Sequence, residues 1–133
     1  MDFGLTGKKA LVLASSRGLG LGIAEALAAE GAEVLITGRN EAALEKAAAE
    51  ITARGAGAAH WTASNLFSAD VVDKLAAAAE QKLGRVDILV NNTGGPPFGG
   101  VAAMTEETLA TQAHAMVFRI IALTPVLDRK SVV

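Results

Sequence analysis

The stretch from Leu11 to Gly22 reads Leu-Val-Leu-Ala-Ser-Ser-Arg-Gly-Leu-Gly-Leu-Gly, and it constrains the fold more than any other part of the chain. An apolar run leads into it, and an Ala- and Leu-rich helical pattern leaves it at Ile23. This order predicts a strand, a glycine turn and a helix. Such a turn lets the backbone approach a phosphate closely, because glycine has no Cβ, and it points helical N–H groups at the anion. The stretch therefore predicts a site for a nucleotide pyrophosphate.

Strand and helix patterns then alternate along the whole chain. Short apolar runs predict strands at residues 9–14, 33–37, 58–63 and 86–90. Apolar residues at helical spacing predict helices at residues 18–30, 41–54, 69–83 and 106–129. We expect Asn40, Ser68 and Thr105 to cap the last three helices, and Pro125 to kink or break the last one. Residues 130–133 look like the start of a fifth strand.

This alternation predicts an α/β fold, a Rossmann-like, doubly wound parallel sheet that is truncated after about four strands. The 133 residues are 51% hydrophobic, which is enough for one domain, residues 1–133, incomplete at its C-terminus. Ligands bind such sheets at the carboxyl ends of the strands, where the strand order reverses. The glycine turn and the loop after residue 90 are expected to open there and to share one site.

Composition excludes several other classes of function. The net charge of -2, with scattered Lys and Arg, offers no basic face, so a nucleic-acid partner is not expected. The chain has no cysteine and only two histidines, His60 and His114, which disfavours a metal site. No leader segment and no uninterrupted apolar run of membrane-spanning length is recognised, so we expect no membrane partner and a cytoplasmic location.

Two motifs resemble those of one enzyme family. Leu13 to Gly20 (Leu-Ala-Ser-Ser-Arg-Gly-Leu-Gly) resembles the Thr-Gly-x-x-x-Gly-x-Gly motif of the short-chain dehydrogenases/reductases, and Asn91-Asn92-Thr93-Gly94 resembles their Asn-Asn-Ala-Gly motif. The chain is similar to the N-terminal, cofactor-binding part of these enzymes, in the manner of a 3-oxoacyl-carrier-protein reductase. The resemblance implies an NADP(H)- or NAD(H)-dependent oxidoreductase acting on a ketone/alcohol pair.

Three departures from the family pattern bear on the site. Ala14 replaces the first motif glycine, and Thr93 replaces the motif alanine. A methyl group at Ala14 is tolerated if its φ is negative, so we expect the phosphate site to survive. Asn65-Leu66 resembles the family's Asp-Leu pair, whose acid reaches the adenine. Asn65 either retains that role or caps its own turn, and the sequence leaves the two alternatives open.

The choice of cofactor is argued from charge. An NAD site needs an acid at the end of the second strand, whereas a 2'-phosphate needs a cation there. That strand ends Thr37-Gly38-Arg39, and Glu33 lies at its other end. Arg39 and Arg17 offer guanidinium groups suited to a phosphate, which favours NADP(H) over NAD(H). The alternative is that both arginines are solvated loop residues.

The resemblance and these arguments together assign cofactor binding to two groups of positions. The first group lies in the glycine turn and comprises Ala14, Ser15, Ser16, Arg17, Gly18, Leu19 and Gly20. The second group lies at the ends of the later strands and comprises Arg39, Asn65, Leu66, Asn91, Asn92, Thr93 and Gly94.

The family's reaction centre is missing from this sequence. The resemblance implies Ser, Tyr and Lys in a Tyr-x-x-x-Lys arrangement, but the chain contains no tyrosine, so no catalytic residue is assigned. His114 is a formal candidate for acid-base work, with a packed or surface histidine as its alternative. We expect the cofactor-binding half of an oxidoreductase, and a homo-oligomer that covers the open sheet. A non-catalytic nucleotide-binding or oligomerisation module, and a fragment with neither property, are the other hypotheses.

Overall fold

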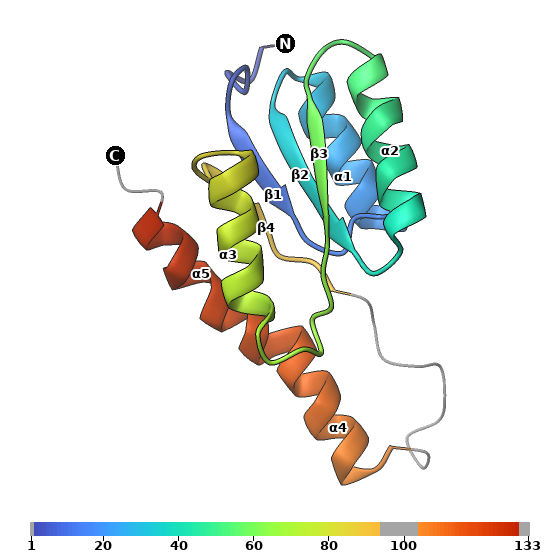
Figure 1. Cartoon of the computed structure of the whole chain (residues 1–133), viewed down its shortest axis with the longest axis vertical. Coiled ribbons are helices and arrows are strands. Elements are labelled where there is room, and N and C mark those ends of the chain that lie inside the picture. The colour runs from blue at the N-terminus through green and yellow to red at the C-terminus, as the bar shows by residue number, and fades with distance from the viewer. Residues whose placement is uncertain (1, 94–103, 131–133) are drawn as a thin grey trace.

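The computed structural model describes residues 2–93 and 104–130 (Figure 1). Its elements follow in the order β1 (Lys9–Val12), α1 (Gly18–Ala29), β2 (Glu33–Gly38), α2 (Glu41–Ala53), β3 (Ala59–Ala63), α3 (Val71–Lys82), β4 (Ile88–Val90), α4 (Glu106–Ala113), the π-helical segment η2 (His114–Phe118) and α5 (Arg119–Lys130). The predicted alternation of strand and helix is confirmed, with element ends that differ by at most about two residues. The predicted fifth strand falls mainly on residues 131–133, outside the described part.

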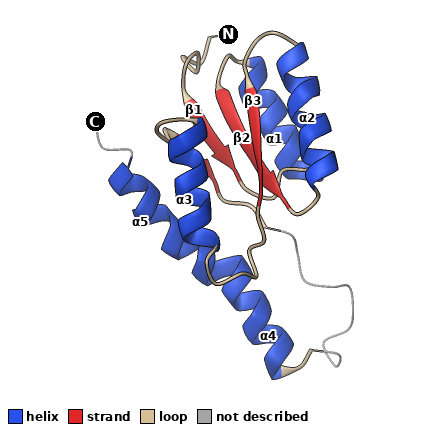
Figure 2. Cartoon of the chain, viewed as in Figure 1, coloured by secondary structure: helices blue, strands red, loops and turns tan. Residues whose placement is uncertain are grey.

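The strands form one parallel sheet in the order β3-β2-β1-β4 (Figure 2). The chain steps outward from β1 to β3, then crosses back to place β4 on the other side of β1. This is a Rossmann-like, doubly wound topology, and its strand order reverses between β1 and β4. Leu13 N–H donates to the carbonyl of Val90 at 3.2 Å, so the two strands are still joined where their loops begin.

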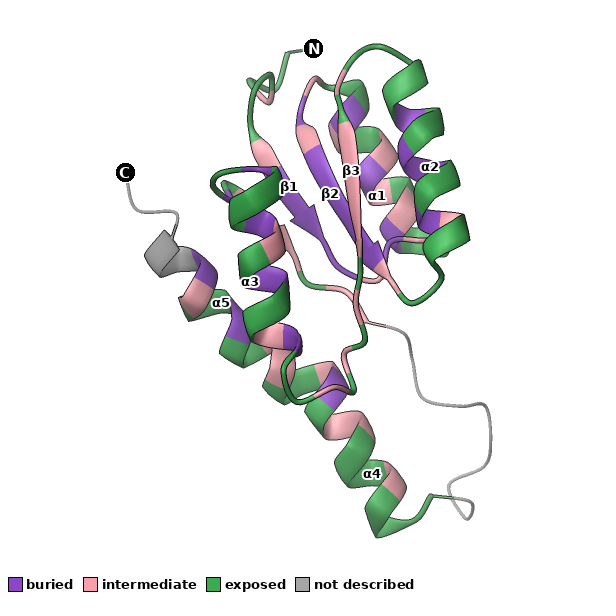
Figure 3. Cartoon of the chain, in the orientation of Figure 1, coloured by how far each residue is buried: buried purple, intermediate pink, exposed green. Residues whose placement is uncertain are grey.

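Helices cover the sheet on both faces, and each face has its own core (Figure 3). Side chains of β1 alternate between them: Ala10 and Val12 pack toward α1 and α2, whereas Leu11 packs toward α3 and α5. Val34 and Leu35 divide in the same way on β2. Central parallel strands are apolar on both sides because both sides are buried. This explains why the sequence shows short continuous apolar runs rather than alternating ones.

Two of the three predicted helix caps are confirmed. Asn40 Oδ1 accepts from Ala43 N–H at 3.1 Å, and Thr105 Oγ1 accepts from Thr108 N–H at 3.1 Å. The prediction for Ser68 is wrong, because α3 begins at Val71 with Asp70 before it. The chain is still in a turn at Ser68, whose N–H donates to the carbonyl of Asn65 at 2.9 Å. Capping propensity alone does not show where such a turn ends.

Of the kink or break predicted at Pro125, the break does not occur. Helix α5 continues through Pro125. The irregular part of the long helix is η2, which begins at His114, eleven residues before Pro125. A proline inside a helix removes one backbone hydrogen bond and crowds the preceding turn. Leu123 and Leu127, on either side of it, are both buried against α3, and this packing retains the helix across the proline.

The same helical stretch, Glu106–Leu127, is long and apolar enough to cross a membrane, by length and composition alone. Core helices of soluble proteins can have the same length and composition. In this chain 17% of the most apolar 18-residue window is buried, and the α5 part packs Leu123 and Leu127 against α3.

Candidate functional site

Ser15 fixes the turn that follows β1. Its side chain is fully buried, and its Oγ donates to the carbonyl of Val12 at 2.7 Å. The same Oγ accepts from Thr37 N–H at 3.0 Å, while Ser15 N–H donates to the carbonyl of Thr37 at 2.8 Å. The turn is therefore tied to the end of β2. Ser15 lies beneath the surface of the site and supports it from below.

Ala14 has a positive φ of 48°, so the expectation of a negative φ is wrong. This left-handed conformation favours glycine, and an alanine there is strained by roughly 1 kcal/mol. The turn is nevertheless formed, because the bonds of Ser15 hold it on one side and Asn92 holds it on the other. The family's glycine at this position thus has a conformational reason, and the present chain tolerates its loss.

Gly20, on the first turn of α1, allows the closest approach in the site. A Cβ at this position would lie 2.3 Å from the carbonyl oxygen of Ala14 and 2.8 Å from Asn92 Nδ2. Asn92 Nδ2 in turn donates to that same Ala14 oxygen at 3.2 Å. The glycine turn, the start of α1 and the loop after β4 therefore meet at one point. This is the juxtaposition that the strand order predicts.

A cleft of about 900 Å³ opens over this meeting point, at the carboxyl ends of the strands. Most of the predicted positions line it, namely Ala14, Ser16, Arg17, Gly18, Leu19, Gly20, Arg39, Asn65, Leu66, Asn92 and Thr93. Three do not: Ser15 is buried beneath it, Asn91 is exposed and lies outside its lining, and Gly94 falls outside the described residues. The structure thus gathers residues from four separate loops into one cleft.

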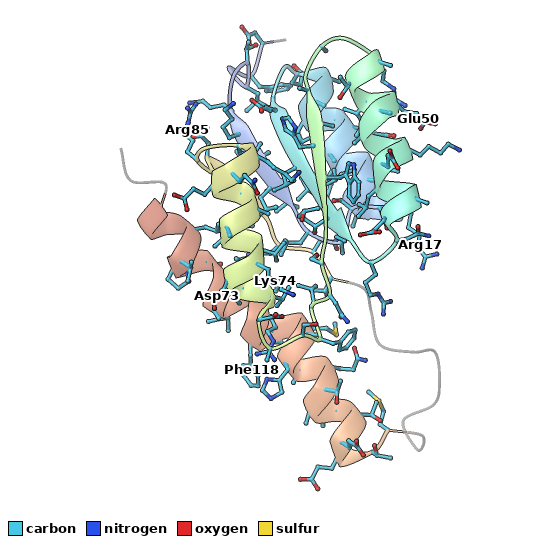
Figure 4. The ribbon with its side chains drawn as sticks, viewed as in Figure 1. Arg17, Glu50, Asp73, Lys74, Arg85 and Phe118 are labelled. Atoms are coloured by element: carbon cyan, nitrogen blue, oxygen red, sulfur yellow. The ribbon has the colours of Figure 1, made fainter. Side chains whose placement is uncertain are left out.

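The charges around the cleft are unbalanced in favour of cations. Arg17 and Arg39 line it, both are exposed, and neither guanidinium group makes a hydrogen bond or ion pair with another described residue. Figure 4 shows Arg17 extending outward from the ribbon. The described lining contains no carboxylate. Asp70, in a second cavity that shares Arg39, Ser64 and Asn65 with the cleft, is paired with Lys74 at 3.0 Å.

Glu33 lies at the opposite end of β2, as its position in the strand predicts. Its carboxylate pairs with Lys9 and accepts from His60 Nε2 at 2.7 Å. Burial raises the pKa of Glu33, but the bonds and charges of Lys9 and His60 outweigh it, and the net pKa is lowered. These groups stabilise the amino-terminal end of the sheet, which is opposite the end that carries the cleft.

Asn65 caps its own turn. Its Oδ1 accepts from Phe67 N–H at 2.9 Å, which is the turn-forming alternative that the sequence left open. The residue also lines the cleft, so its Nδ2 group remains available on that side. The turn also brings Phe67 into the lining, a position that sequence reasoning missed. The only signal was an apolar ring placed directly after Asn65-Leu66.

His114 lies outside the lining of the cleft. It is exposed on η2, and its ring contacts Phe118 edge to face with 5.2 Å between centroids. His114 is therefore a surface histidine, the alternative to acid-base work that the sequence left open. The same helix does supply Gln112 and Ala115 to the cleft, and Gln112 Oε1 is buried without a described hydrogen-bond partner. Sequence reasoning assigned nothing to Gln112, although its spacing to Ala115 places the two on one helical face.

Comparison with known proteins places this geometry in a family. The family described as "short chain dehydrogenase" matches residues 8–129. Gluconate 5-dehydrogenase from Gluconobacter oxydans (strain 621H) is 41% identical over 92 residues, which are 69% of this chain and 36% of that protein. A 3-oxoacyl-[acyl-carrier-protein] reductase from Aquifex aeolicus (strain VF5) is 38% identical over 94 residues, 71% of this chain and 38% of that protein.

Solved structures agree with the sequence relatives. L-sorbose reductase from Gluconobacter frateurii, complexed with NADPH and L-sorbose, superposes with a TM-score of 0.91 at 28% identity, over 98% of this chain and 50% of that one. A 3-oxoacyl (acyl-carrier-protein) reductase from Agrobacterium tumefaciens with NADP bound gives 0.87 at 34% identity, again over 98% and 50%. The chain spans about half the length of these structures and less than half that of the curated relatives.

Proposed function

The chain belongs to the short-chain dehydrogenase family, and from that premise we propose that it is the NADP(H)-binding part of an oxidoreductase that interconverts a ketone and an alcohol. One observation carries the proposal: a glycine cradle at the strand-order reversal opens into a cleft lined by two unpaired arginines and no described carboxylate. The NADPH- and NADP-bound relatives support the same proposal. A bound NADP(H) would supply or accept the hydride.

The cradle fits the diphosphate of a dinucleotide. Gly18 and Leu19 begin α1, and among the described residues their N–H groups have no hydrogen-bond acceptor. Such N–H groups and the helix dipole attract an anion. Gly20 allows the turn to lie close to the helix, since any Cβ there would meet the Ala14 carbonyl. Gly18 and Leu19 would therefore hold the diphosphate at the start of α1.

The preference for NADP(H) over NAD(H) rests on Arg39 and Arg17. Arg39 follows β2 directly, where an NAD site places an acid for the ribose hydroxyls. A guanidinium there binds the 2'-phosphate of NADP(H) and gains nothing from the free hydroxyl of NAD(H). Asn65 and Leu66 would face the adenine, whereas Asn92 and Thr93 would border the nicotinamide side.

A titration tests this proposal. The single tryptophan, Trp61, serves as donor for energy transfer to the reduced nicotinamide, so NADPH and NADH can be compared in one assay. We expect NADPH to bind more tightly, and Arg39→Gln combined with Arg17→Gln to remove most of that preference. Equal binding of the two cofactors by the unmodified chain would contradict the NADP(H) assignment. Absence of binding at millimolar cofactor would contradict the function itself.

The proposal gives these residues a binding role and leaves acid-base chemistry outside them. The 133 residues contain no tyrosine, and the one formal candidate, His114, lies away from the cleft. The second candidate function, a nucleotide-binding module without turnover, is favoured by that same observation. Assaying the chain with NADPH and a diketone separates the two, because only an autonomous oxidoreductase oxidises the cofactor. We expect no turnover by the 133 residues alone.

We also propose that the chain forms a homo-oligomer in the cytoplasm. Strand β4 ends the described sheet, and its three residues are only partly buried. The long helix exposes Leu109, Val117, Phe118 and Ile121 to solvent. An apolar surface of this kind is typical of a protein contact. The net charge of -2 provides no basic face for nucleic acid, and the proposal includes no membrane partner.

A further inference from the structure

Arg39 and Phe67 come from neighbouring strand ends. β2 and β3 pair in parallel up to Gly38 and Ala63, and Ser64 N–H donates to the carbonyl of Gly38 at 2.7 Å. The two loops therefore leave the sheet side by side. Each places one large side chain in the wall of the cleft.

The two side chains contact each other. Arg39 Cζ lies 5.9 Å from the centroid of the Phe67 ring, within the range of a cation–π interaction. The Arg39 guanidinium has no hydrogen bond or ion pair with a described residue, so among those residues the Phe67 ring is its partner. An unpaired arginine on an exposed loop samples many rotamers, and ordering it costs conformational entropy when a ligand binds. A ring that restricts those rotamers lowers that cost.

Phe67 is itself held in place despite being 42% exposed. Its backbone N–H donates to Asn65 Oδ1 at 2.9 Å, and the next N–H, that of Ser68, donates to the carbonyl of Asn65 at 2.9 Å. The turn thus fixes the direction in which the ring leaves the backbone. Burial contributes little to the placement of a ring this exposed. The contact with Arg39 is the other interaction that the ring makes.

We propose that Phe67 is a positioning residue for nucleotide specificity: its ring orients the Arg39 guanidinium toward the 2'-phosphate of NADP(H). The inference rests on the proposed function. Because NADH carries no phosphate at that ribose hydroxyl, the contribution of Phe67 through Arg39 falls on NADPH alone. Asn65 contributes indirectly, by holding the turn that carries the ring.

The experiment compares Phe67→Leu with Phe67→Trp in the full chain, using the Trp61 energy-transfer titration for Phe67→Leu and calorimetry for both. Leucine retains apolar bulk and removes the π face, whereas tryptophan retains a π face. We expect Phe67→Leu to weaken NADPH about two- to fivefold, the range for an exposed cation–π contact, with NADH unchanged. Phe67→Trp should retain the NADPH preference. Thermal unfolding checks that both variants remain folded, as the exposure of Phe67 predicts.

A double-mutant cycle shows whether Phe67 acts through Arg39. In an Arg39→Gln background, Phe67→Leu should leave the NADPH affinity unchanged. Equal weakening of NADPH and NADH, or the same loss with and without Arg39, would overturn the inference and show instead that the ring contacts the cofactor directly. No change in either cofactor would overturn it too. If the unmodified chain fails to bind NADPH, the proposed function fails first, and this outcome differs from all the others.

Discussion

Ala14 is held in a left-handed conformation by its surroundings, with a φ of 48°. Glycine adopts this conformation without the steric cost of a Cβ. We therefore expect Ala14→Gly to raise the free energy of unfolding by up to about 1 kcal/mol, reduced by the larger entropy that glycine has in the unfolded chain. Urea unfolding at neutral pH measures the change.

Ala49→Gly is the matched control for that substitution. Ala49 is exposed in the middle of α2, so the same chemical change should lower the free energy of unfolding by about 1 kcal/mol. Destabilisation of both variants would show that the strain at Ala14 is absent in solution.

Gly20 and Gly22 form a second matched pair, on one helix and two residues apart. A Cβ at Gly20 would lie 2.3 Å from the Ala14 carbonyl, whereas a Cβ at Gly22 meets nothing within 4 Å. Gly20→Ala should therefore cost about 1–3 kcal/mol of stability and weaken NADPH, since the turn or the helix must shift. Gly22→Ala should stabilise α1 by about 1 kcal/mol. Chemical unfolding of both variants decides, and similar effects at the two positions would refute the close approach.

At this scale the sequence predicts the members of the site better than their conformations. The two motifs identify Gly20 and Asn92, because spacing and residue type carry that information. The φ of Ala14 and the contact of Phe67 with Arg39 depend on how separate loops meet, which one-dimensional patterns do not contain. Asn65 lies between these cases, since its turn is local and its place in the cleft is not.

Among the elements, β1 is joined to both of its neighbours at its first residue. Lys9 Nζ pairs with Glu33 on β2, and Lys9 N–H donates to Asp87 Oδ2, just before β4, at 2.9 Å. The backbone bond from Lys9 is the main reason that the pKa of Asp87 is lowered. Two carboxylates, those of Glu33 and Asp87, thus hold the amino-terminal end of the sheet, and they do so in their ionised form.

This arrangement predicts how stability depends on pH. The pKa of Glu33 in the folded chain lies below its ordinary value of 4.5. Its contribution to the free energy of unfolding is therefore fully present above pH 4.5 and is lost as the pH falls through the lowered pKa. We expect Glu33→Gln to be less stable than the unmodified chain at pH 7, with the difference shrinking below pH 4.5. Unfolding in urea across this range measures it.

Glu50→Gln is the control for this prediction. Glu50 is exposed on α2 and has no recorded partner among the described residues (Figure 4). Its variant should follow the unmodified chain at every pH. A constant difference between Glu33→Gln and the unmodified chain down to pH 3 would contradict the ionic role of Glu33.

The order and type of the elements follow from the sequence, because β1, β2 and β4 are built on short apolar runs between turn residues and the helices alternate with them. The irregular parts do not follow in this way. The α3 start depends on the turn at Asn65, and the helix at Pro125 survives because Leu123 and Leu127 pack against α3. Tertiary packing overrides local propensity at both places.

For the whole molecule, the exposed apolar face of the long helix predicts self-association. Phe118 projects from this helix in Figure 4, and Ile121, one turn later, is 63% exposed. We expect light scattering to show a dimer or a larger oligomer, and Ile121→Lys to shift it toward the monomer, because a charge cannot be buried there without a partner. Ala42→Lys, at an exposed position on α2, adds the same charge and should leave the assembly unchanged. A monomer for the unmodified chain would refute the proposed oligomer.

The central claim is that the cleft at the strand-order reversal holds NADP(H). The most direct test is two-dimensional amide NMR of the labelled chain during titration with NADP⁺. The structure predicts chemical-shift changes concentrated at residues 14–20, 39–40, 64–67 and 92–93. The amides of Lys9, Glu33 and His60, toward the amino-terminal end of the sheet, should be unaffected. Chemical-shift changes confined to the amino-terminal end of the sheet, or none at millimolar NADP⁺, would contradict the claim that the cleft holds NADP(H).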